Sequence, residues 1–263
     1  MCSRSICLEH GLRLFEKLVE YVEAAGCDCI ALSGGLDTGL VALAAAEAGL
    51  RPRAVTVYYT GGLPRDLWYA ITLARMLGFR HELLPVDDSY IASRARTILE
   101  CTGRRDYIEV RNDAVFLAAL EWSAKSGCRC MFTGDGGDEL LAGYTFLRTL
   151  YGDGLRGEQL RLGVRGRYPA LELADCIGVR VEAPYLYDEA LAVALQTPTC
   201  CLLGESLEGK YVSRLVLEEL GFGWLAERPK TPAEAGAGTD VLDREALGEI
   251  TGLELQECCS PSP

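Results

Sequence analysis

The sequence predicts an α/β protein with a doubly wound parallel sheet and a mainly helical C-terminal part. Short apolar runs alternate with amphipathic segments over the first half of the chain, and this alternation is typical of parallel strands with helices on both faces of the sheet. From about residue 140 the pattern is mostly helical. With 263 residues, we expect a single domain with an α/β core (1–145) and a helical part (146–263).

The α/β core is expected to contain four strands separated by helices. Apolar residues at helical spacing, among them Leu12, Phe15 and Leu18, predict a first helix over residues 9–25. Later helices are predicted at residues 38–48, 66–77, 88–101 and 112–126, with Asp66 as a candidate N-cap. The strands are predicted at residues 27–32, 54–59, 81–86 and 129–133.

The second half is expected to contain helices and one long loop. Residues 229–240 are rich in Pro, Gly and Ala and predict a mobile loop. Residues 255–263 are expected to fray. The helices are predicted at residues 140–151, 168–177, 188–196 and 208–220.

Composition limits the class of protein. Hydrophobic residues make up 49% of the chain and charged residues 24%, which is ordinary for a globular protein. No apolar run approaches the ~18 residues of a membrane span, and the N-terminus lacks a secretory pattern, so we expect a cytoplasmic protein without a membrane partner. The net charge of −12 argues against broad nucleic-acid binding.

One basic cluster stands out against this acidic background. We interpret it as a solvated face, the usual role of such a run. It consists of Arg148, Arg156, Arg161, Arg165 and Arg167.

The twelve cysteines are many for a cytoplasmic chain. No CxxC pair exists, and the two histidines are remote in sequence from the cysteine pairs, so a zinc or iron–sulfur site has little support. Cys27, Cys29, Cys128 and Cys130 lie where strands begin and could act as small buried hydrophobes. The single Asn and three Gln suggest a hyperthermophile, where intracellular disulfides occur. Some cysteines could then be bridged, including those at 258–259.

Two loops carry most of the functional information. Residues 33–38 (SGGLDT) and 133–139 (TGDGGDE) each follow a short apolar strand, so both belong at the carboxyl edge of the sheet, where ligands bind. The first loop offers backbone N–H groups, hydroxyls and a carboxylate before a helix, which is typical of a phosphate cradle. The second adds carboxylates. Together they predict a nucleoside triphosphate site with Mg²⁺.

These loops resemble those of a known family. SGGLDT resembles the SGGxDS loop of the ATP pyrophosphatases, the PP-loop enzymes that split ATP into AMP and pyrophosphate. Residues 133–144 (TGDGGDELLAGY) are similar to the SGEGSDExxGGY segment of the asparagine synthetase synthetase domain. Two further matches follow in the family's order: residues 178–186 (GVRVEAPYL), similar to GVEARVPFL, and the run 228–230 (RPK) before a Gly-rich stretch. The resemblance covers about 25–240 and implies an adenine nucleotide alpha hydrolase-like fold.

The resemblance also implies roles for individual residues. Asp37 and Asp138 match the carboxylates that hold Mg²⁺, and Lys230 matches a Lys that stabilises charge on the leaving pyrophosphate. Asp135 stands where the family has a Glu near the acyl-adenylate, and Lys210 is a further candidate phosphate ligand. The phosphate loop comprises Ser33, Gly34, Gly35, Asp37 and Thr38. The adenine is expected near Ala31, Leu32, Val57 and Gly134. The structural alternatives are a tight Gly-rich turn at the first loop, a solvated Lys230, and Glu139 as a helix cap.

The chain departs from the family in several places. Asp135 is one methylene shorter than Glu, Glu182 replaces the usual Arg, and Thr38 replaces Ser while keeping the hydroxyl. Cys2 follows Met1, as in the family's glutaminase nucleophile, but only about 25 residues precede the first strand, too few for a glutaminase domain. We therefore expect ammonia from solution or from a separate glutaminase subunit.

The sequence favours an ATP-dependent amide-forming ligase that adenylates a small carboxylate, with aspartate as the leading candidate, before ammonia attacks. An alternative is a PP-loop enzyme that adenylates a tRNA base for thiolation, which the cysteines favour and the acidic charge opposes. A second alternative is a non-catalytic ATP-binding regulatory subunit. A homodimer is a possible assembly.

Overall fold

The computed structural model describes residues 2–204 and 209–257. Its centre is a parallel sheet of five strands in the order β3-β2-β1-β4-β5, which confirms the predicted fold class. The chain crosses from β3 at one edge to β4 on the far side of β1, so β1 lies in the middle, next to β2 and β4. The strands are β1 (Cys29–Ala31), β2 (Arg53–Tyr59), β3 (His81–Val86), β4 (Met131–Phe132) and β5 (Val181–Glu182).

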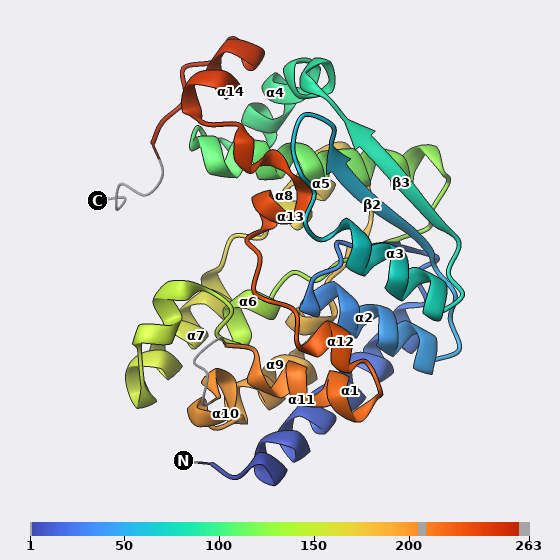
Figure 1. The fold of residues 1–263 in the computed structure, drawn as a ribbon, viewed down its shortest axis with the longest axis vertical. Helices are drawn as coiled ribbons and strands as arrows, with labels where there is room; N and C mark the ends of the chain where they lie inside the picture. Colours follow the sequence, from blue (N-terminus) through green and yellow to red (C-terminus); the bar gives the residue numbers. More distant parts are fainter. Residues whose placement is uncertain (1, 205–208, 258–263) are drawn as a thin grey trace.

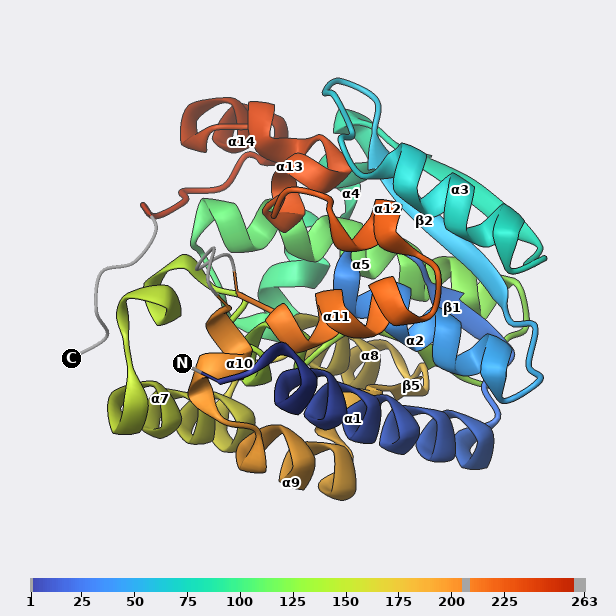
Figure 2. The same ribbon diagram turned by 60° about the horizontal axis from the view of Figure 1, so that its bottom comes forward.

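Helices cover both faces of the sheet (Figures 1 and 2). Ile30 and Phe132 point into a core shared with α1, α2, α3 and α11, whereas Val55 and Met131 point into a second core shared with α4, α5, α8 and α14. The first five helices are α1 (Arg4–Ala25), α2 (Leu36–Glu47), α3 (Leu67–Met76), α4 (Asp88–Thr102) and α5 (Tyr107–Lys125). The later ones are α6 (Gly137–Leu140), α7 (Gly152–Arg165), α8 (Pro169–Ile177), α9 (Asp188–Gln196), α10 (Thr199–Leu203), α11 (Tyr211–Glu219), α12 (Gly223–Ala226), α13 (Ala233–Ala237) and α14 (Arg244–Thr251).

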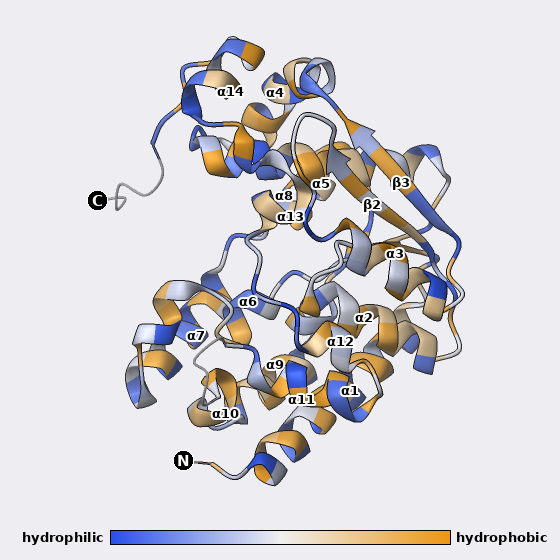
Figure 3. Ribbon diagram, viewed as in Figure 1, coloured by the Kyte–Doolittle hydropathy of each residue, from blue (hydrophilic) through white to orange (hydrophobic). Residues whose placement is uncertain are grey.

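Most helices combine a hydrophilic and a hydrophobic face, as the mixed colours along each ribbon show (Figure 3). Among the described residues, no helix is both long and apolar enough to cross a bilayer.

Side-chain caps set two helix starts earlier than the predicted ones. The hydroxyl of Ser3 accepts a hydrogen bond from the Ile6 N–H, so α1 begins at Arg4 and not at residue 9. The carboxylate of Asp106 accepts from the N–H groups of Ile108 and Glu109, so α5 begins at Tyr107 and not at residue 112. Asp66 does occupy the N-cap position of α3, but its side chain makes no capping bond.

The prediction of a helix over residues 140–151 was wrong. Helix α6 ends at Leu140, because Ala142 has a left-handed backbone (φ 57°) and Gly143 follows it. A short 3₁₀ helix (Thr145–Thr149) comes next, and α7 then begins at Gly152. Three glycines in the first turns of α7 lower its helix propensity and concealed it from the pattern.

The segment predicted to be a mobile loop is anchored. Residues 229–242 contain α13 and a 3₁₀ helix (Thr239–Val241) and cross the molecule between α12 and α14 (Figure 1). The N–H groups of Arg65 and Asp66 donate to the carbonyls of Ala235 and Gly236. A Cβ on Gly62 would collide with the backbone of Gly238, so the two segments touch.

The last residues are only partly within the described chain. Gln256, expected to fray, pairs with Asp106 in an isolated bridge, and its N–H donates to the carbonyl of Arg105. The cysteines at 258–259, predicted to pin the tail, lie outside the described residues, as do 205–208 at the start of a predicted helix.

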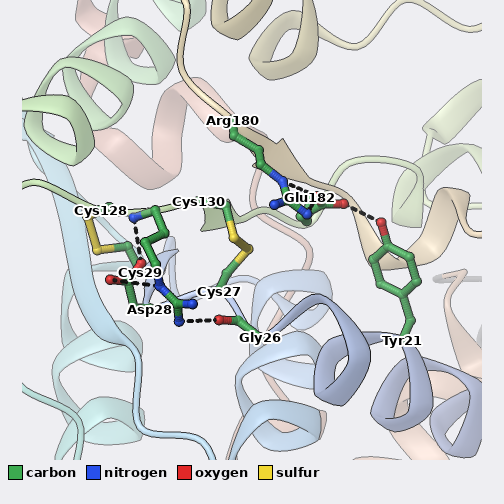
Figure 4. The surroundings of a disulfide bond; sticks show 10 residues. Tyr21, Gly26, Cys27, Asp28, Cys29, Cys128, Cys130, Arg180 and Glu182 are labelled. Carbon is green, nitrogen blue, oxygen red and sulfur yellow. Dashed lines mark hydrogen bonds and ion pairs between the residues drawn. A yellow bond between two sulfur atoms is a disulfide. The ribbon is translucent and has the colours of Figure 1, made fainter.

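Two disulfides join the neighbouring strands β1 and β4 where the strands begin. Cys29–Cys128 lies in the core under α5, and Cys27–Cys130 lies in the core under α2, so one bridge stands on each face of the sheet (Figure 4). These four residues are therefore bridged cystines and not merely small hydrophobes. Three further bridges are Cys2–Cys200, Cys7–Cys201 and Cys101–Cys176, so no described cysteine is free.

Candidate active site

The two predicted loops meet at the carboxyl edge of the sheet. They follow β1 and β4, which are neighbours, and both line one cavity of about 750 Å³. The anchored segment 229–242 contributes several residues to the cavity wall, Lys230 among them. The edge predicted to bind a ligand is thus a real cavity, with room for a nucleotide.

The first loop is shaped as a cradle at the start of α2. Ser33 Oγ lies 2.9 Å from Thr38 Oγ1 and accepts from the Gly35 N–H at 3.2 Å. Gly35, at the N-cap position, has no side chain to satisfy the first N–H groups of α2, so these remain available to an anion. Gly34 has φ 83°, and a Cβ there would strike the backbone of Asp66 and Ala70. Its role is to let α3 approach the loop.

Four charged side chains meet beside the cradle. Lys210 Nζ donates to Asp37 Oδ2 and lies 2.6 Å from Asp138 Oδ1. Lys230 Nζ donates to the same Asp138 oxygen at 2.6 Å. The structure therefore brings together four residues that the sequence separates by up to 193 positions, and Lys230 is not in a solvated loop.

The cluster perturbs the acidity of its members. Burial raises the pKa of Asp37, although Lys210 opposes this. Burial would also raise the pKa of Asp138, but the ammonium groups of Lys210 and Lys230 hold it well below its usual value. Burial and repulsion from Lys210 lower the pKa of Lys230, whereas the two carboxylates keep the pKa of Lys210 raised. Perturbations of this kind are typical of functional sites.

The residues present fit a divalent cation. Asp37 Oδ1 is buried and has no hydrogen-bond partner among the described residues, so it is a ready oxygen ligand. A Cβ on Gly137 would strike the Asp37 carboxylate, and a Cβ on Gly143 would strike Asp138. Glycine at both positions keeps the space around the two carboxylates open.

Asp135 lies in the same cavity, apart from the four-charge cluster. Thr133 Oγ1 donates to its Oδ2 at 2.5 Å, which fixes the direction of the carboxylate. Burial raises the pKa of Asp135 to about 6, and the Thr133 bond opposes this only partly. A carboxylate of this acidity can accept a proton near neutral pH.

The predicted adenine contacts all line the cavity: Ala31, Leu32, Val57 and Gly134. Sequence reasoning missed several further apolar residues of the lining, Val55 and Phe116 among them, and the chain's only asparagine, Asn112. The scarcity of asparagine was the one available signal for Asn112.

Sequence reasoning also missed two arginines. Arg228 is 4% exposed, pairs with Asp66 and lies 5.2 Å from the Tyr69 ring centre. Arg148 lines the cavity, so the interpretation of the basic cluster as a solvated face was wrong for it. The RPK match was the available signal for Arg228.

The remaining members of the basic cluster have structural or surface contacts. Arg156 donates to the carbonyls of Thr197 and Ala194, and Arg161 pairs with Glu158. Arg167 pairs with Glu172 at the rim of the cavity. The exposed Arg165 fits the solvated reading.

Two other predicted residues differ from expectation. Glu139 does not cap a helix, because its Oε1 accepts from the Tyr144 hydroxyl at 2.5 Å inside the cavity wall. Glu182, at the family's Arg position, accepts from Tyr21 and pairs with Arg180 beside the strand-joining disulfides (Figure 4). It does not line the cavity, so its acidic charge stands outside the proposed binding site.

A sequence model of the family described as "Asparagine synthase" matches residues 22–177, more than half of the chain. This chain belongs to the asparagine synthase family. The match covers both loops and with them Asp37, Asp135 and Asp138. Lys210 and Lys230 lie beyond it, and the structure brings them to the loops. No curated protein matches the chain.

Solved structures are similar to this chain only at low identity and low TM-score. NMN synthetase from Francisella tularensis is 18% identical, with 88% of this chain and 99% of that chain covered and a TM-score of 0.40. A predicted subunit of tRNA methyltransferase from Methanocaldococcus jannaschii is 18% identical, with 78% and 92% covered and a TM-score of 0.36. NAD⁺ synthetase from Burkholderia pseudomallei is 14% identical, with 95% and 88% covered and a TM-score of 0.34. These scores say nothing of the ligands of this asparagine synthase family member.

Proposed function

We propose that the protein is an AMP-forming ligase that joins ammonia to a carboxylate, with aspartate as the leading acceptor. Membership of the asparagine synthase family supports the use of ATP. The observation that carries the proposal is a cluster of four charged side chains beside the Gly-rich cradle at the N-terminus of α2. They belong to Asp37, Asp138, Lys210 and Lys230. Such a group suits a triphosphate whose terminal two phosphates must leave as one unit.

In this proposal the acceptor carboxylate attacks the α-phosphorus of ATP. The bond from that phosphorus to the bridging oxygen breaks, and pyrophosphate departs with the bond's electron pair. Ammonia then attacks the acyl carbon, AMP leaves with the former carboxylate oxygen, and the nitrogen gives up its proton. Asp135 is the proposed acceptor of that proton, because its pKa of about 6 makes it a carboxylate at neutral pH.

The chain's own residues divide the work. Ser33, Gly35 and Thr38 hold phosphate oxygens at the cradle, with the N–H groups of α2. Asp37 and Asp138 would hold Mg²⁺, which supplies charge neutralisation on the phosphates. Lys210 and Lys230 stabilise the charge that develops on pyrophosphate.

Neither alternative gains an observation in its favour. The cysteines were the sequence feature that favoured tRNA thiolation, and all those within the described residues are bridged, which leaves no thiol there to carry sulfur. A subunit that only binds ATP would have no need of a buried carboxylate able to take a proton near neutral pH, such as Asp135.

The test is an acceptor screen with nucleotide analysis. The purified chain is incubated with ATP, Mg²⁺, ammonium and each of a panel of amino-acid and other small carboxylates, and the nucleotides are separated by chromatography. The proposal expects AMP, equimolar with amide, for at least one acceptor. ADP as the sole product would contradict it, because a kinase-type cleavage leaves no pyrophosphate.

A further inference from the structure

Two arginines that belong to no predicted site lie beside the two loops, Arg228 beside the first and Arg148 beside the second. Arg228 lies against the phosphate cradle: its Nη1 is 3.7 Å from where a Cβ on Gly35 would be. Arg148 lies just beyond the second loop, residues 133–139, here called the acidic loop: its Nη2 donates to the Gly143 carbonyl at 3.3 Å, and the Gly143 N–H donates to the carbonyl of Asp138 in that loop. Both side chains line the cavity.

Each guanidinium has unused hydrogen-bonding capacity. The Nε atoms of Arg148 and Arg228 are buried and have no hydrogen-bond partner among the described residues. A buried, unsatisfied donor of a charged group is costly unless a ligand completes it. Arg228 is held in place by Asp66 on one side and the Tyr69 ring on the other, so its orientation toward the cradle is fixed before any ligand arrives.

Arg148 is also close to the segment that carries Lys210, one of the two lysines of the four-charge cluster. Its Nε lies 3.6 Å from the position of a Cβ on Gly209, the residue before Lys210. The Lys210 N–H donates to the Leu141 carbonyl, which ties the start of α11 to the segment after α6. Arg148 and Lys210 therefore lie beside the same crossing of these two segments.

The cations beside the two loops favour a polyanion as the ligand. Arg148, Lys210, Arg228 and Lys230 all line the cavity there, and the carboxylates of Asp37, Asp66, Asp135, Asp138 and Glu139 offset part of their charge. A divalent cation held by Asp37 and Asp138 would add two positive charges. Pyrophosphate carries several negative charges near neutral pH, whereas a substrate carboxylate carries one. Guanidinium groups also match phosphate oxygens in a two-point geometry.

We propose that Arg148 and Arg228 bind the pyrophosphate portion of ATP, from the acidic loop and from the cradle respectively. This inference rests on the proposed function and adds to it the residues that hold the leaving group. Both arginines contact the phosphates that leave, so they act on pyrophosphate and not on AMP or the acceptor.

The experiment measures binding of Mg²⁺–pyrophosphate and of AMP to the intact chain by calorimetry, without turnover. Arg148→Met should weaken pyrophosphate binding by about tenfold or more and change AMP binding by less than about twofold, the effect of losing one charged hydrogen bond. Arg165→Met, an exposed arginine of α7, is the matched control for loss of one positive charge and should change neither. Arg228→Lys, which keeps the charge opposite Asp66, should also weaken pyrophosphate binding. Thermal unfolding of each variant verifies the fold.

The outcomes separate the two proposals. If Arg148→Met and Arg228→Lys bind pyrophosphate as tightly as the wild-type protein does, the inference is overturned and the proposed function still stands. Weakened AMP binding with unchanged pyrophosphate binding would assign Arg148 to the AMP portion and also overturn it. Wild-type protein that binds neither AMP nor pyrophosphate would overturn the proposed function itself.

Discussion

Lys230 is the residue whose contacts bear most directly on chemistry. Its ammonium donates to Asp138 and is partly buried, so it already stands where charge would develop on the leaving group. A cation that binds the transition state more strongly than ATP accelerates the reaction, and loss of one such stabiliser costs about 100- to 1000-fold in rate. Lys230→Ala should lower kcat by this amount while the Kd for ATP rises far less, as measured by AMP release and by equilibrium binding.

The control for this substitution is Lys125→Ala, a lysine whose side chain is 75% exposed. It should change neither quantity. Because Lys230 and Asp138 act on one charge, Asp138→Asn/Lys230→Ala should lose less activity than the two single losses combined. Near-normal turnover of Lys230→Ala would show that this lysine does not stabilise the leaving group and has only a structural role.

The pKa of Asp135 leads to a prediction about pH. Only the unprotonated form of Asp135 can take a proton from the attacking nitrogen. Turnover at constant free ammonia should therefore fall as the pH drops below about 6. Asp135→Asn should be slow at every pH and should not show this fall in rate. Because the pKa is raised on folding, the buried charge of Asp135 lowers the free energy of unfolding at pH 7. It has little effect at pH 3.5, which is below the unfolded pKa of 3.8, because the carboxyl group is then largely protonated in both states.

Asp135→Asn should therefore raise the free energy of unfolding at pH 7, on the order of 1 kcal/mol, with little effect at pH 3.5. Denaturant unfolding at the two pH values measures this difference. An equal effect at both values would show that the charge of Asp135 bears no such cost.

At the scale of elements, the fit between the two loops depends on glycine. Gly137 begins α6 directly against the Asp37 carboxylate, and a Cβ there would come within 2.5 Å of Oδ1. Gly137→Ala should displace Asp37 by a fraction of an ångström to an ångström and reduce turnover by about 100-fold while the protein remains folded. Gly154→Ala on α7, where a Cβ meets nothing within 4 Å, is the matched control and should retain activity. Equal activity of both variants would contradict a tight fit between the loops.

The disulfides act on the other edge of the sheet. Cys29–Cys128 joins strand starts that are 99 residues apart, and such a loop gives a stabilisation of about 2–4 kcal/mol. Cys29→Ser/Cys128→Ser should lower Tm by on the order of 10 °C in calorimetry and leave turnover at 25 °C near normal, because the active site is at the opposite ends of these strands.

The bridge of Cys2 to Cys200 leads to a related expectation, that Cys2→Ala leaves ammonia-dependent turnover unchanged. A large loss of activity in a folded Cys2→Ala protein would show that this cysteine takes part in chemistry.

The elements also show where sequence reasoning succeeds and where it stops. Both loops were predictable, because a short apolar run and a Gly-rich acidic turn are adjacent in sequence. Strand β5 was not, since Arg180 and Glu182 leave no apolar run there. Helix α7 was concealed by Gly152, Gly154 and Gly157. The pairing of Cys27 with Cys130 depends on the sheet order, which the local pattern does not contain.

For the whole molecule, the site is a product of long-range contacts. Lys210 and Lys230 could be assigned from the sequence only by resemblance, and their meeting at Asp138 follows from the path of residues 229–242 across the cavity. Arg148 was interpreted as part of a surface cluster, because a run of arginines is most often a solvated face. Burial of charges among neighbours from distant segments is invisible to composition and periodicity.

The central claim is that this cavity makes an acyl-adenylate from ATP and a carboxylate. Exchange of labelled pyrophosphate into ATP tests that step alone, since reversal requires bound adenylate but no nitrogen nucleophile. With the acceptor identified by the screen, we predict exchange that needs Mg²⁺ and the acceptor, does not need ammonia, and is lost in Asp37→Asn. Exchange that is absent under conditions of net AMP and amide formation, or that proceeds without any carboxylate, would contradict the account.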